Sequence, residues 1–297
     1  MLIYGKEIRE QLKRKITSIS QSMPLVMAII KVGDDMSSAS YVKGIQRFAA
    51  EAGINTELVT LAGDSSEQQI IDTIRQLNRD DRITGIMVQT PLPKGCNVSR
   101  VINSMDPDKD VEGIHNYNLG RLISGEKGVR PCTPAAVIRI LKAHNVPLEG
   151  SKVTIVGRSM VVGSPLSVMM TAENATVTLC HSRTRNLAGE TLRADIVVAA
   201  VGKAEFIKPD MVNENSVLID VGTNFTEDGK MVGDVSAAAR EKVRMASAVP
   251  GGVGVITVAE LFMNLTWLGS KRFKAAISPG RTPTITLQED AEKIAAN

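Results

Sequence analysis

The sequence predicts an α/β fold in two domains: a three-layer N-terminal domain and a doubly wound second domain. The first observation is that strand-like apolar runs alternate with helix-like patterns from residue 25 to residue 88. The second is that residues 151–170 read as strand, glycine turn and helix, and a strand ending at glycine recurs twice later. At 297 residues the chain is long enough for two hydrophobic cores.

The N-terminal domain is predicted from three strand–helix units. Apolar residues at helical spacing indicate a first helix over residues 5–20, which Pro24 ends. Buried strands are expected at 25–32, 55–61 and 84–88, and helices at 37–52 and 66–80. A charged loop over 105–113 and a short helix over 116–122 follow. A helix over 135–144, with Thr133 as its N-cap, leads into the second domain.

These elements suggest the domain limits. Residues 1–134 form the first domain, and a C-terminal helix over 256–270 packs back to complete it. Residues 135–255 form the second domain, with strands expected at 153–156, 175–180, 195–201 and 216–221. The segment 278–297 contains prolines and lacks periodicity, so an extended tail is expected there.

The turn after the strand 153–156 carries the first functional signal. Glycine at 157 and 163 allows the backbone to turn tightly and to approach a phosphate at a helix N-terminus. The spacing is G-x-S-x-x-x-G, with Ser159 where the usual dinucleotide fingerprint has its second glycine. A turn that needs glycine for steric reasons alone is the alternative interpretation.

The end of the next strand indicates which dinucleotide would bind. NAD-binding folds place an acidic residue there to hold the ribose 2′-hydroxyl. This chain instead has His181, Ser182, Arg183, Thr184 and Arg185. Guanidinium groups bind phosphate through paired hydrogen bonds, so with Arg158 nearby the sequence favours NADP, which carries a 2′-phosphate. For His181, a plain strand-end role is equally open.

Composition argues against several other functions. A net charge of +3 and only 3% aromatic residues do not indicate a nucleic-acid-binding surface. The three cysteines are far apart and match neither a zinc site nor a disulfide framework. Asp106, Asp108 and Asp110 lie in a proline-bearing loop and are interpreted as turn formers, so no metal site is expected. No membrane span or signal peptide is expected either, which favours the cytoplasm.

Eight stretches, in order, resemble one family. They are VGDDMSSASYV (32–42), VQTPLP (88–93), DPDKDVEG (106–113), RPCTP (130–134), VGRSMVVGSP (156–165), DVGTN (220–224), VGDV (232–235) and PGGVGVITVA (250–259). Together they resemble the methylenetetrahydrofolate dehydrogenase/methenyltetrahydrofolate cyclohydrolase family, the FolD type. The family implies a folate cleft between the domains, a homodimer joined through the nucleotide domains, and two reactions. One is hydride transfer from 5,10-methylenetetrahydrofolate to NADP or NAD; the other is hydrolysis of the methenyl product to 10-formyltetrahydrofolate.

The resemblance also implies site residues. Tyr41 matches the tyrosine that lies against the folate, and Gln89 matches the glutamine near the reacting carbons. Pro250, Gly251 and Gly252 match the glycine loop that borders the folate. The residues expected on the cofactor side are Gly157, Arg158, Ser159, Gly163, His181, Ser182, Arg183, Gly202, Gly222 and Thr223.

Three departures from the family pattern lie on the folate side. Ile45 stands where the family has an active-site lysine, one helical turn beyond Tyr41 and therefore expected to face the same cleft. Glu112 replaces the aspartate that binds the pterin, where it is still expected to bind, and Val255-Ile256 replace Pro-Met. Hydride transfer needs no proton-transferring side chain, whereas hydrolysis does. The prediction is a dehydrogenase with weak or absent cyclohydrolase activity; the alternatives are a fully bifunctional enzyme and a non-catalytic homologue.

Overall fold

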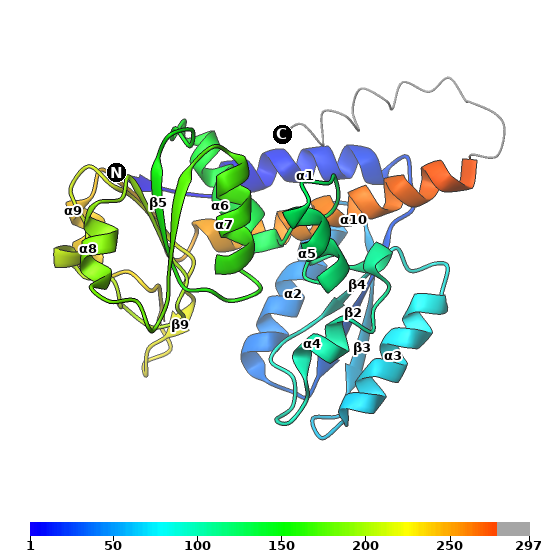
Figure 1. Ribbon diagram of the computed structural model, residues 1–297. Helices are drawn as coiled ribbons and strands as arrows, with labels where there is room; N and C mark the ends of the chain where they lie inside the picture. The colour runs from blue at the N-terminus through cyan, green and yellow to red at the C-terminus, as the bar shows by residue number, and fades with distance from the viewer. Residues whose placement is uncertain (278–297) are drawn as a thin grey trace.

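Two parallel β-sheets, each with its own helices, lie side by side and are bridged by long helices (Figure 1). The computed structural model describes residues 1–277. The predicted tail over 278–297 lies outside the described residues.

The N-terminal sheet has the order β3-β2-β4 with all strands parallel. Its strands are β2 (Val26–Val32), β3 (Asn55–Leu61) and β4 (Gly85–Val88). The helical elements around it are α2 (Met36–Glu51), α3 (Glu67–Arg79), α4 (Val98–Ile102), the 3₁₀ turn η1 (Pro107–Lys109) and α5 (Asn116–Ile123). The three strands and the helices expected over 37–52, 66–80 and 116–122 are confirmed to within one or two residues.

Alternation along β2 explains the layers. Met27 and Ile29 belong to one apolar core, which also contains residues of α2, while Ala28 and Ile30 belong to a second core that contains residues of α3 and α4. Successive side chains on a strand point to opposite faces, so helices are needed on both sides. The predicted three-layer arrangement is confirmed.

The end of α3 is tied to the loop that leads toward the site. The buried ammonium of Lys109 donates hydrogen bonds of 2.8–2.9 Å to the carbonyl oxygens of Leu77, Asn78 and Asp80. The carbonyls of Leu77 and Asp80 each also accept one backbone N–H, from Asp80 and Ile83, and Lys109 adds a further donor at this helix end. The contact fixes η1, and with it the start of the segment 110–114.

The second sheet is also parallel, with the order β1-β11-β8-β7-β5-β6. Its strands are β1 (Leu2–Ile3), β5 (Lys152–Val156), β6 (Thr176–Cys180), β7 (Ile196–Ala199), β8 (Val217–Asp220) and β11 (Met245–Ser247). The helical elements between them are α7 (Gly163–Ala172), α8 (Leu187–Leu192), the 3₁₀ turn η2 (Pro209–Met211) and α9 (Ala237–Lys242). The four predicted strands are present. Because β6 and β7 flank β5 on opposite sides, the chain changes direction at β5, where doubly wound sheets bind ligands.

Four short strands were not predicted. β11 adds to the sheet beside β8, and β9 (Asn224–Phe225) pairs with β10 (Met231–Val232) in an antiparallel hairpin. β1 pairs with β11, with Leu2 opposite Ala246. The first residues therefore join the second sheet, whereas the sequence analysis places residues 1–134 in the first domain. A two-residue strand carries no periodicity from which its partner could be inferred.

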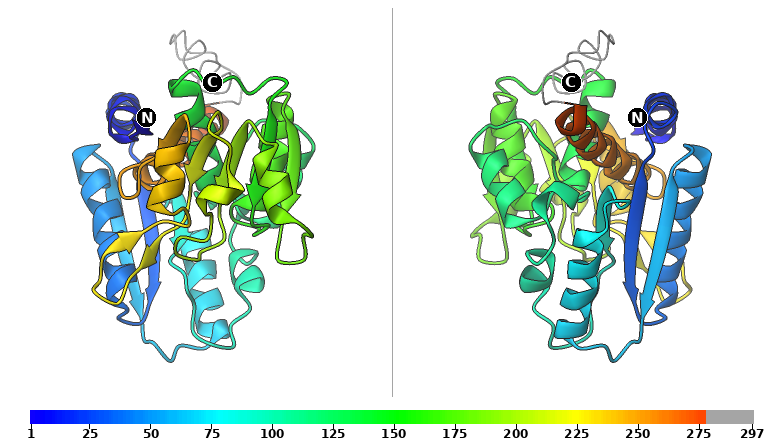
Figure 2. Two further views of the ribbon diagram at one scale, coloured as in Figure 1. Left: turned by 90° about the vertical axis from the view of Figure 1, so that its left-hand side faces the viewer. Right: turned by 90° about the vertical axis from the view of Figure 1, so that its right-hand side faces the viewer.

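Three helices connect the two sheets: α1 (Lys6–Ser20), α6 (Cys132–Ala143) and α10 (Val253–Ile277). α10 packs against both α1 and α6, and Figure 2 shows α1 and α10 at the same end of the molecule. α6 begins at Cys132, so Thr133 is inside the helix and is not its N-cap. α10 begins three residues before the expected Ile256 and continues past residue 270.

α10 also corrects the expectation about membrane spans. The stretch Val253–Lys274 is long and apolar enough, by length and composition, to cross a bilayer. In the structure 61% of its most apolar window is buried, against α1 and α6 among others. It is therefore the core helix of this fold, and its apolar character follows from burial on several sides.

The stacked pair Phe48–Phe262 joins α2 to α10, with ring centroids 4.9 Å apart and both side chains fully buried. We predict that Phe262→Ala lowers the free energy of unfolding by about 3–5 kcal/mol, measured by urea denaturation. Phe273→Ala, on the same helix but 41% exposed, is the control and should cost far less. Equal losses in the two variants would show that the stacked pair is not a main packing contact.

Candidate functional site

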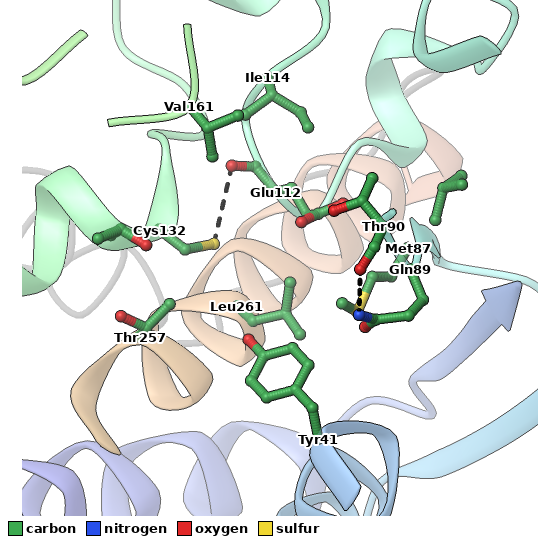
Figure 3. Close-up of a pocket in the computed structure, with 12 residues that line it drawn as sticks. Tyr41, Met87, Gln89, Thr90, Glu112, Ile114, Cys132, Val161, Thr257 and Leu261 are labelled. Atoms are coloured by element: carbon green, nitrogen blue, oxygen red, sulfur yellow. Dashed lines mark hydrogen bonds between the residues drawn. The ribbon is translucent and has the colours of Figure 1, made fainter. Parts of the chain in front are cut away.

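A pocket of about 200 Å³ lies where the two domains meet (Figure 3). Its lining comes from α2, the end of β4, the segment 112–114, the start of α6, the glycine turn after β5, and α10. The lining residues are Tyr41, Met87, Val88, Gln89, Thr90, Glu112, Ile114, Cys132, Thr133, Val161, Thr257 and Leu261. The structure thus brings Tyr41, Gln89 and Glu112 together, as the sequence analysis expected.

Tyr41 presents its ring and hydroxyl to this pocket from α2 (Figure 3). The residue is 39% exposed, but its hydroxyl end is enclosed. Burial raises the pKa of the Tyr41 hydroxyl well above its usual value, and the charges of Glu112 and Cys132 raise it further. Tyr41 therefore offers a flat apolar surface and a neutral hydroxyl.

Glu112 is held in the pocket by the carboxylate of Asp110. Asp110 accepts hydrogen bonds from the backbone N–H groups of Glu112 (3.2 Å), Gly113 (2.9 Å) and His115 (2.9 Å). Burial raises the pKa of Glu112 to about 8, and the nearby charge of Asp110 adds to this, against a hydrogen bond from the Val88 backbone. No lysine, arginine or histidine lines the described pocket, so Glu112 is mainly protonated at pH 7.

Gln89 has an unused hydrogen-bond acceptor. Its side chain is 9% exposed, and its Nε2 donates to the carbonyl of Thr90 at 2.6 Å. Its Oε1 is buried and has no partner among the described residues. An unpaired buried carbonyl oxygen costs about 1–3 kcal/mol, so the pocket is suited to a ligand that donates a hydrogen bond there.

Cys132 is a packed thiol, as expected. It donates to the carbonyl oxygens of Val111 (3.4 Å) and Glu112 (3.7 Å), and Asn264 Nδ2 lies 3.5 Å from its sulfur. Burial raises the pKa of Cys132 well above its usual value, assisted by the charge of Glu112. A thiol of this kind is a poor nucleophile at neutral pH.

Ile45 does not lie where the sequence analysis placed it. Its side chain is fully buried in the core that contains Phe48, and it does not line the pocket. Helical spacing correctly places Ile45 near the face of α2 that carries Tyr41. One helical turn after Tyr41, however, this face packs against the core and no longer faces the pocket. Position 45 therefore contributes no polar group to the site.

The glycine loop 250–252 also lies outside the pocket lining. The carbonyl of Gly251 accepts a hydrogen bond from Gly5 N at 2.8 Å, and a Cβ on Gly252 would lie 2.3 Å from the carbonyl oxygen of Ala248. These contacts join β11 to the start of α1. Thr257 and Leu261, one and two turns into α10, reach the pocket instead.

On the nucleotide side, two glycines permit a very close backbone approach. Gly157 has φ = +119°, and a Cβ there would lie 2.1 Å from the carbonyl oxygen of Ala200. A Cβ on Gly163 would lie 1.8 Å from the carbonyl oxygen of Gly157. Ser159 Oγ accepts from Val162 N at 3.1 Å and so shapes the turn. Both contacts are with the backbone of this chain, so the turn that leads into the N-terminus of α7 requires glycine at these two positions.

The other expected cofactor residues lie at the same edge of this sheet. Val156 of β5 pairs with Cys180 of β6, so the side chains that follow each strand are neighbours. Arg158, Ser182 and Arg183 are exposed there. His181 Nδ1 accepts from Arg183 N at 3.1 Å, which gives His181 a role in the turn. Gly202, Gly222 and Thr223 follow β7 and β8.

Two family models match the chain. Residues 3–112 match the tetrahydrofolate dehydrogenase/cyclohydrolase catalytic domain, and residues 131–273 match its NAD(P)-binding domain. The chain belongs to the tetrahydrofolate dehydrogenase/cyclohydrolase family.

Relatives of known name support this assignment. The bifunctional protein FolD 2 of Syntrophomonas wolfei is 62% identical over 271 residues, which cover 91% of this chain and 100% of that protein. The bifunctional FolD of Campylobacter jejuni has a similar structure, with a TM-score of 0.88 and 35% identity, covering 92% of this chain and 99% of that one. The FolD of Trypanosoma brucei, solved with NADP cofactor and inhibitor, has a TM-score of 0.87 at 26% identity, covering 92% and 98%.

The sequence analysis did not identify several of the residues that line the pocket. Thr257 and Leu261 are spaced four residues apart, and this spacing places both on one face of a helix. Val161 lies in the glycine turn and also lines the pocket, which its place in a motif does not indicate. Within residues 1–277 no cluster of metal-ligating side chains occurs, and Asp106 accepts from Asp108 N at 2.9 Å, as a turn former does.

The raised pKa of Glu112 makes stability depend on pH. Between about pH 4.5 and 8 the unfolded chain ionises this group while the folded chain does not, so burial of Glu112 destabilises the fold increasingly as pH rises. We predict that Glu112→Gln gains free energy of unfolding relative to wild type from pH 5 to 8, by at most about 1.4 kcal/mol per pH unit. Chemical denaturation at several pH values measures this, with the exposed Glu214→Gln as control. A difference independent of pH would contradict it.

Proposed function

We propose that this chain oxidises 5,10-methylenetetrahydrofolate with NADP and hydrolyses the methenyl product only weakly. The family includes both activities, so the distinction rests on the pocket. The carrying observation is that Tyr41, Gln89 and Glu112 line one pocket to which position 45 contributes no ionisable group.

The pocket suits a reduced folate. The Tyr41 ring offers a surface on which the folate would lie, and Glu112 offers a carboxyl group to the donor groups of the pterin. Gln89 Oε1 supplies a free acceptor close by. Positioning is what these residues would contribute, because hydride transfer requires alignment more than proton movement.

The edge of the second sheet after β5 and β6 suits NADP. The glycine turn over residues 157–163 leads into the N-terminus of α7, whose backbone N–H groups would hold the pyrophosphate. Arg158, Ser182 and Arg183 would hold the 2′-phosphate, and residues 181–185 include no acidic side chain that would repel it. When bound, NADP supplies the acceptor for the hydride. The presence of NADP in the related trypanosomal enzyme supports this choice.

Hydrolysis has a different requirement. Water must lose a proton as it attacks the methenyl carbon, and a ring nitrogen must later receive one. Burial keeps Tyr41 and Cys132 neutral near pH 7, because it raises the pKa of both groups. Glu112 is the one described lining residue that titrates near neutrality, and we assign it to the pterin.

There are two alternatives to this proposed function. A fully bifunctional enzyme is favoured by Glu112, whose pKa of about 8 would suit proton transfer if it reached the reacting carbon. A non-catalytic homologue is the other.

We also propose a cytoplasmic homodimer joined through the nucleotide domains. The exposed apolar residues Met1, Leu2 and Tyr4 at the β1 edge of the sheet support an interface. Light scattering would test the dimer.

The decisive assay follows the absorbance of reduced nicotinamide when the purified protein is given methylenetetrahydrofolate and NADP. A second assay on the same sample follows the loss of the methenyl compound. We expect turnover in the first assay and near-background rates in the second. No turnover in the first would reject the dehydrogenase, and rapid hydrolysis in the second would favour the bifunctional enzyme.

Arg158 should distinguish the two cofactors. We predict that Arg158→Ala raises the KM for NADP by about tenfold or more, while the KM for NAD changes little, because only NADP carries the 2′-phosphate. Initial rates with both cofactors at saturating folate measure this. Arg185→Ala, at an exposed position in the turn after β6, is a comparison variant. Equal weakening of both cofactors would remove Arg158 from the 2′-phosphate site.

Position 45 should report on hydrolysis. Position 45 is buried one helical turn from Tyr41, which lines the pocket, and a long lysine side chain extends its amine out of apolar surroundings toward polar ones. We predict that Ile45→Lys raises the rate of methenyl hydrolysis by at least about tenfold, because an amine that reaches the pocket from there can transfer protons, which is worth roughly 10²–10⁴ in rate. Ile45→Met is the matched control, since it fills the buried site without an ionisable group. The lysine variant should also be less stable, because it buries an amine. A folded lysine variant no faster than the methionine variant would contradict the assignment of position 45.

A further inference from the structure

The loops that follow β7 and β8 form one half of the nucleotide-binding edge. Ala199 and Asp220 end these strands and are directly paired, so the segments 200–203 and 221–224 leave the sheet side by side. Ligands of doubly wound sheets bind outside the carboxyl ends of the strands. The position of these two loops therefore decides the shape of that half of the site.

A single carboxylate joins the two loops. Asp234 is fully buried and follows β10. Its Oδ2 accepts from the backbone N–H groups of Val201 (2.6 Å) and Gly202 (2.9 Å). Its Oδ1 accepts from Lys203 N (2.8 Å) and from Asn224 Nδ2 (2.9 Å). Three consecutive amides of one loop and one side chain of the other thus converge on this group.

A second carboxylate holds Asp234 in place. Asp220 Oδ1 accepts from Asp234 N at 2.9 Å and from Gly222 N at 3.0 Å. Its Oδ2 accepts from Val235 N at 3.0 Å and from the Arg240 guanidinium at 3.0 Å. The packing leaves no space for a side chain at Gly222, where a Cβ would lie 2.2 Å from Asp234 Oδ1.

The chemistry of Asp234 argues against direct contact with a cofactor. Its two oxygens already accept four hydrogen bonds, which uses the capacity of a carboxylate. A negative charge near a dinucleotide phosphate would also be repulsive. The donors to Asp234 are three backbone amides and one neutral side-chain amide. Hydrogen bonds from such groups fix the geometry of the loops that carry them.

We propose that Asp234 is a positioning residue for the cofactor: it holds the loops at Gly202 and Gly222 in the arrangement that receives the half of the dinucleotide away from the 2′-phosphate. This inference rests on the proposed function in taking NADP as the cofactor. It differs from the role of Arg158, Ser182 and Arg183, which lie after β5 and β6 at the other part of the edge.

Asp234→Asn tests the proposal. The amide has nearly the same shape, but its NH₂ group would face two donors instead of accepting from them. Buried donors left unpaired disfavour this arrangement of the loops, so we expect the KM values for NADP and for NAD both to rise by about tenfold. Their ratio should stay constant, because the 2′-phosphate site is untouched. The KM for methylenetetrahydrofolate should stay as in wild type.

Asp228→Asn is the matched control, since Asp228 is exposed near the tip of the β9–β10 hairpin. Unchanged cofactor KM values in Asp234→Asn would overturn the proposal. So would an equal rise in the KM for folate, which would indicate general loss of structure. If Asp234→Asn fails to fold, Asn224→Ala removes one of the four bonds and should raise both cofactor KM values by a smaller factor; no rise would overturn the proposal.

Calorimetric binding separates this inference from the proposed function. Titration of NADP and NAD into wild type and Asp234→Asn measures both affinities without turnover. If wild type binds NADP but does not oxidise methylenetetrahydrofolate, the proposed function fails, while a parallel loss of both affinities in the variant still supports the role of Asp234. Equal affinities of wild type and variant would reject that role whether or not turnover occurs.

Discussion

The burial of α10 between the two sheets is the constraint on which both the fold and the site depend. Phe262 packs on Phe48 of α2, and the buried Glu260 forms an ion pair with the partly exposed Arg139 of α6. The same helix sends Thr257 and Leu261 into the pocket. Because one rigid element contributes to the core and to the pocket, the position of the pocket is fixed by packing and does not depend on loops alone.

Asn264 shows how that helix controls the loops. Its Nδ2 donates to the carbonyl oxygens of Val111 and Arg130, each at 2.8 Å, and its Oδ1 accepts from Arg130 N at 3.2 Å. Val111 precedes Glu112, and Arg130 lies just before α6 and Cys132. A buried amide with its hydrogen bonds satisfied is a specific anchor, because displacement of either segment would leave polar groups unpaired.

The pocket and the nucleotide-binding edge of the second sheet have different electrostatic environments. The pocket beside Tyr41 has no cationic lining residue among those described, and burial raises the pKa values of Tyr41, Glu112 and Cys132, which keeps it close to neutral at pH 7. The edge of the second sheet carries exposed arginines beside the glycine turn that follows β5. The pocket therefore suits a neutral ligand that forms hydrogen bonds, and the sheet edge suits a ligand rich in phosphate.

The sequence by itself determined the fold class, the seven longer strands, most helices and the glycine turn. These follow from local signals: period-two or continuous apolar runs in strands, helical spacing, capping residues and glycine where φ is positive. Motif order also identified the family and the grouping of Tyr41, Gln89 and Glu112, because eight spaced stretches are far more specific than any one of them.

Only the tertiary structure decided where several of those residues face. Ile45 has the spacing of a cleft residue, yet the helix on which it lies turns that side into the core. Residues 2–3 join the second sheet because β11, some 240 residues later, offers a free edge. The unpaired Gln89 Oε1, the raised pKa of Glu112 and the bonds of Asp234 likewise arise from groups distant in sequence. Burial and pairing are set by the whole packed chain, and local patterns carry no record of them.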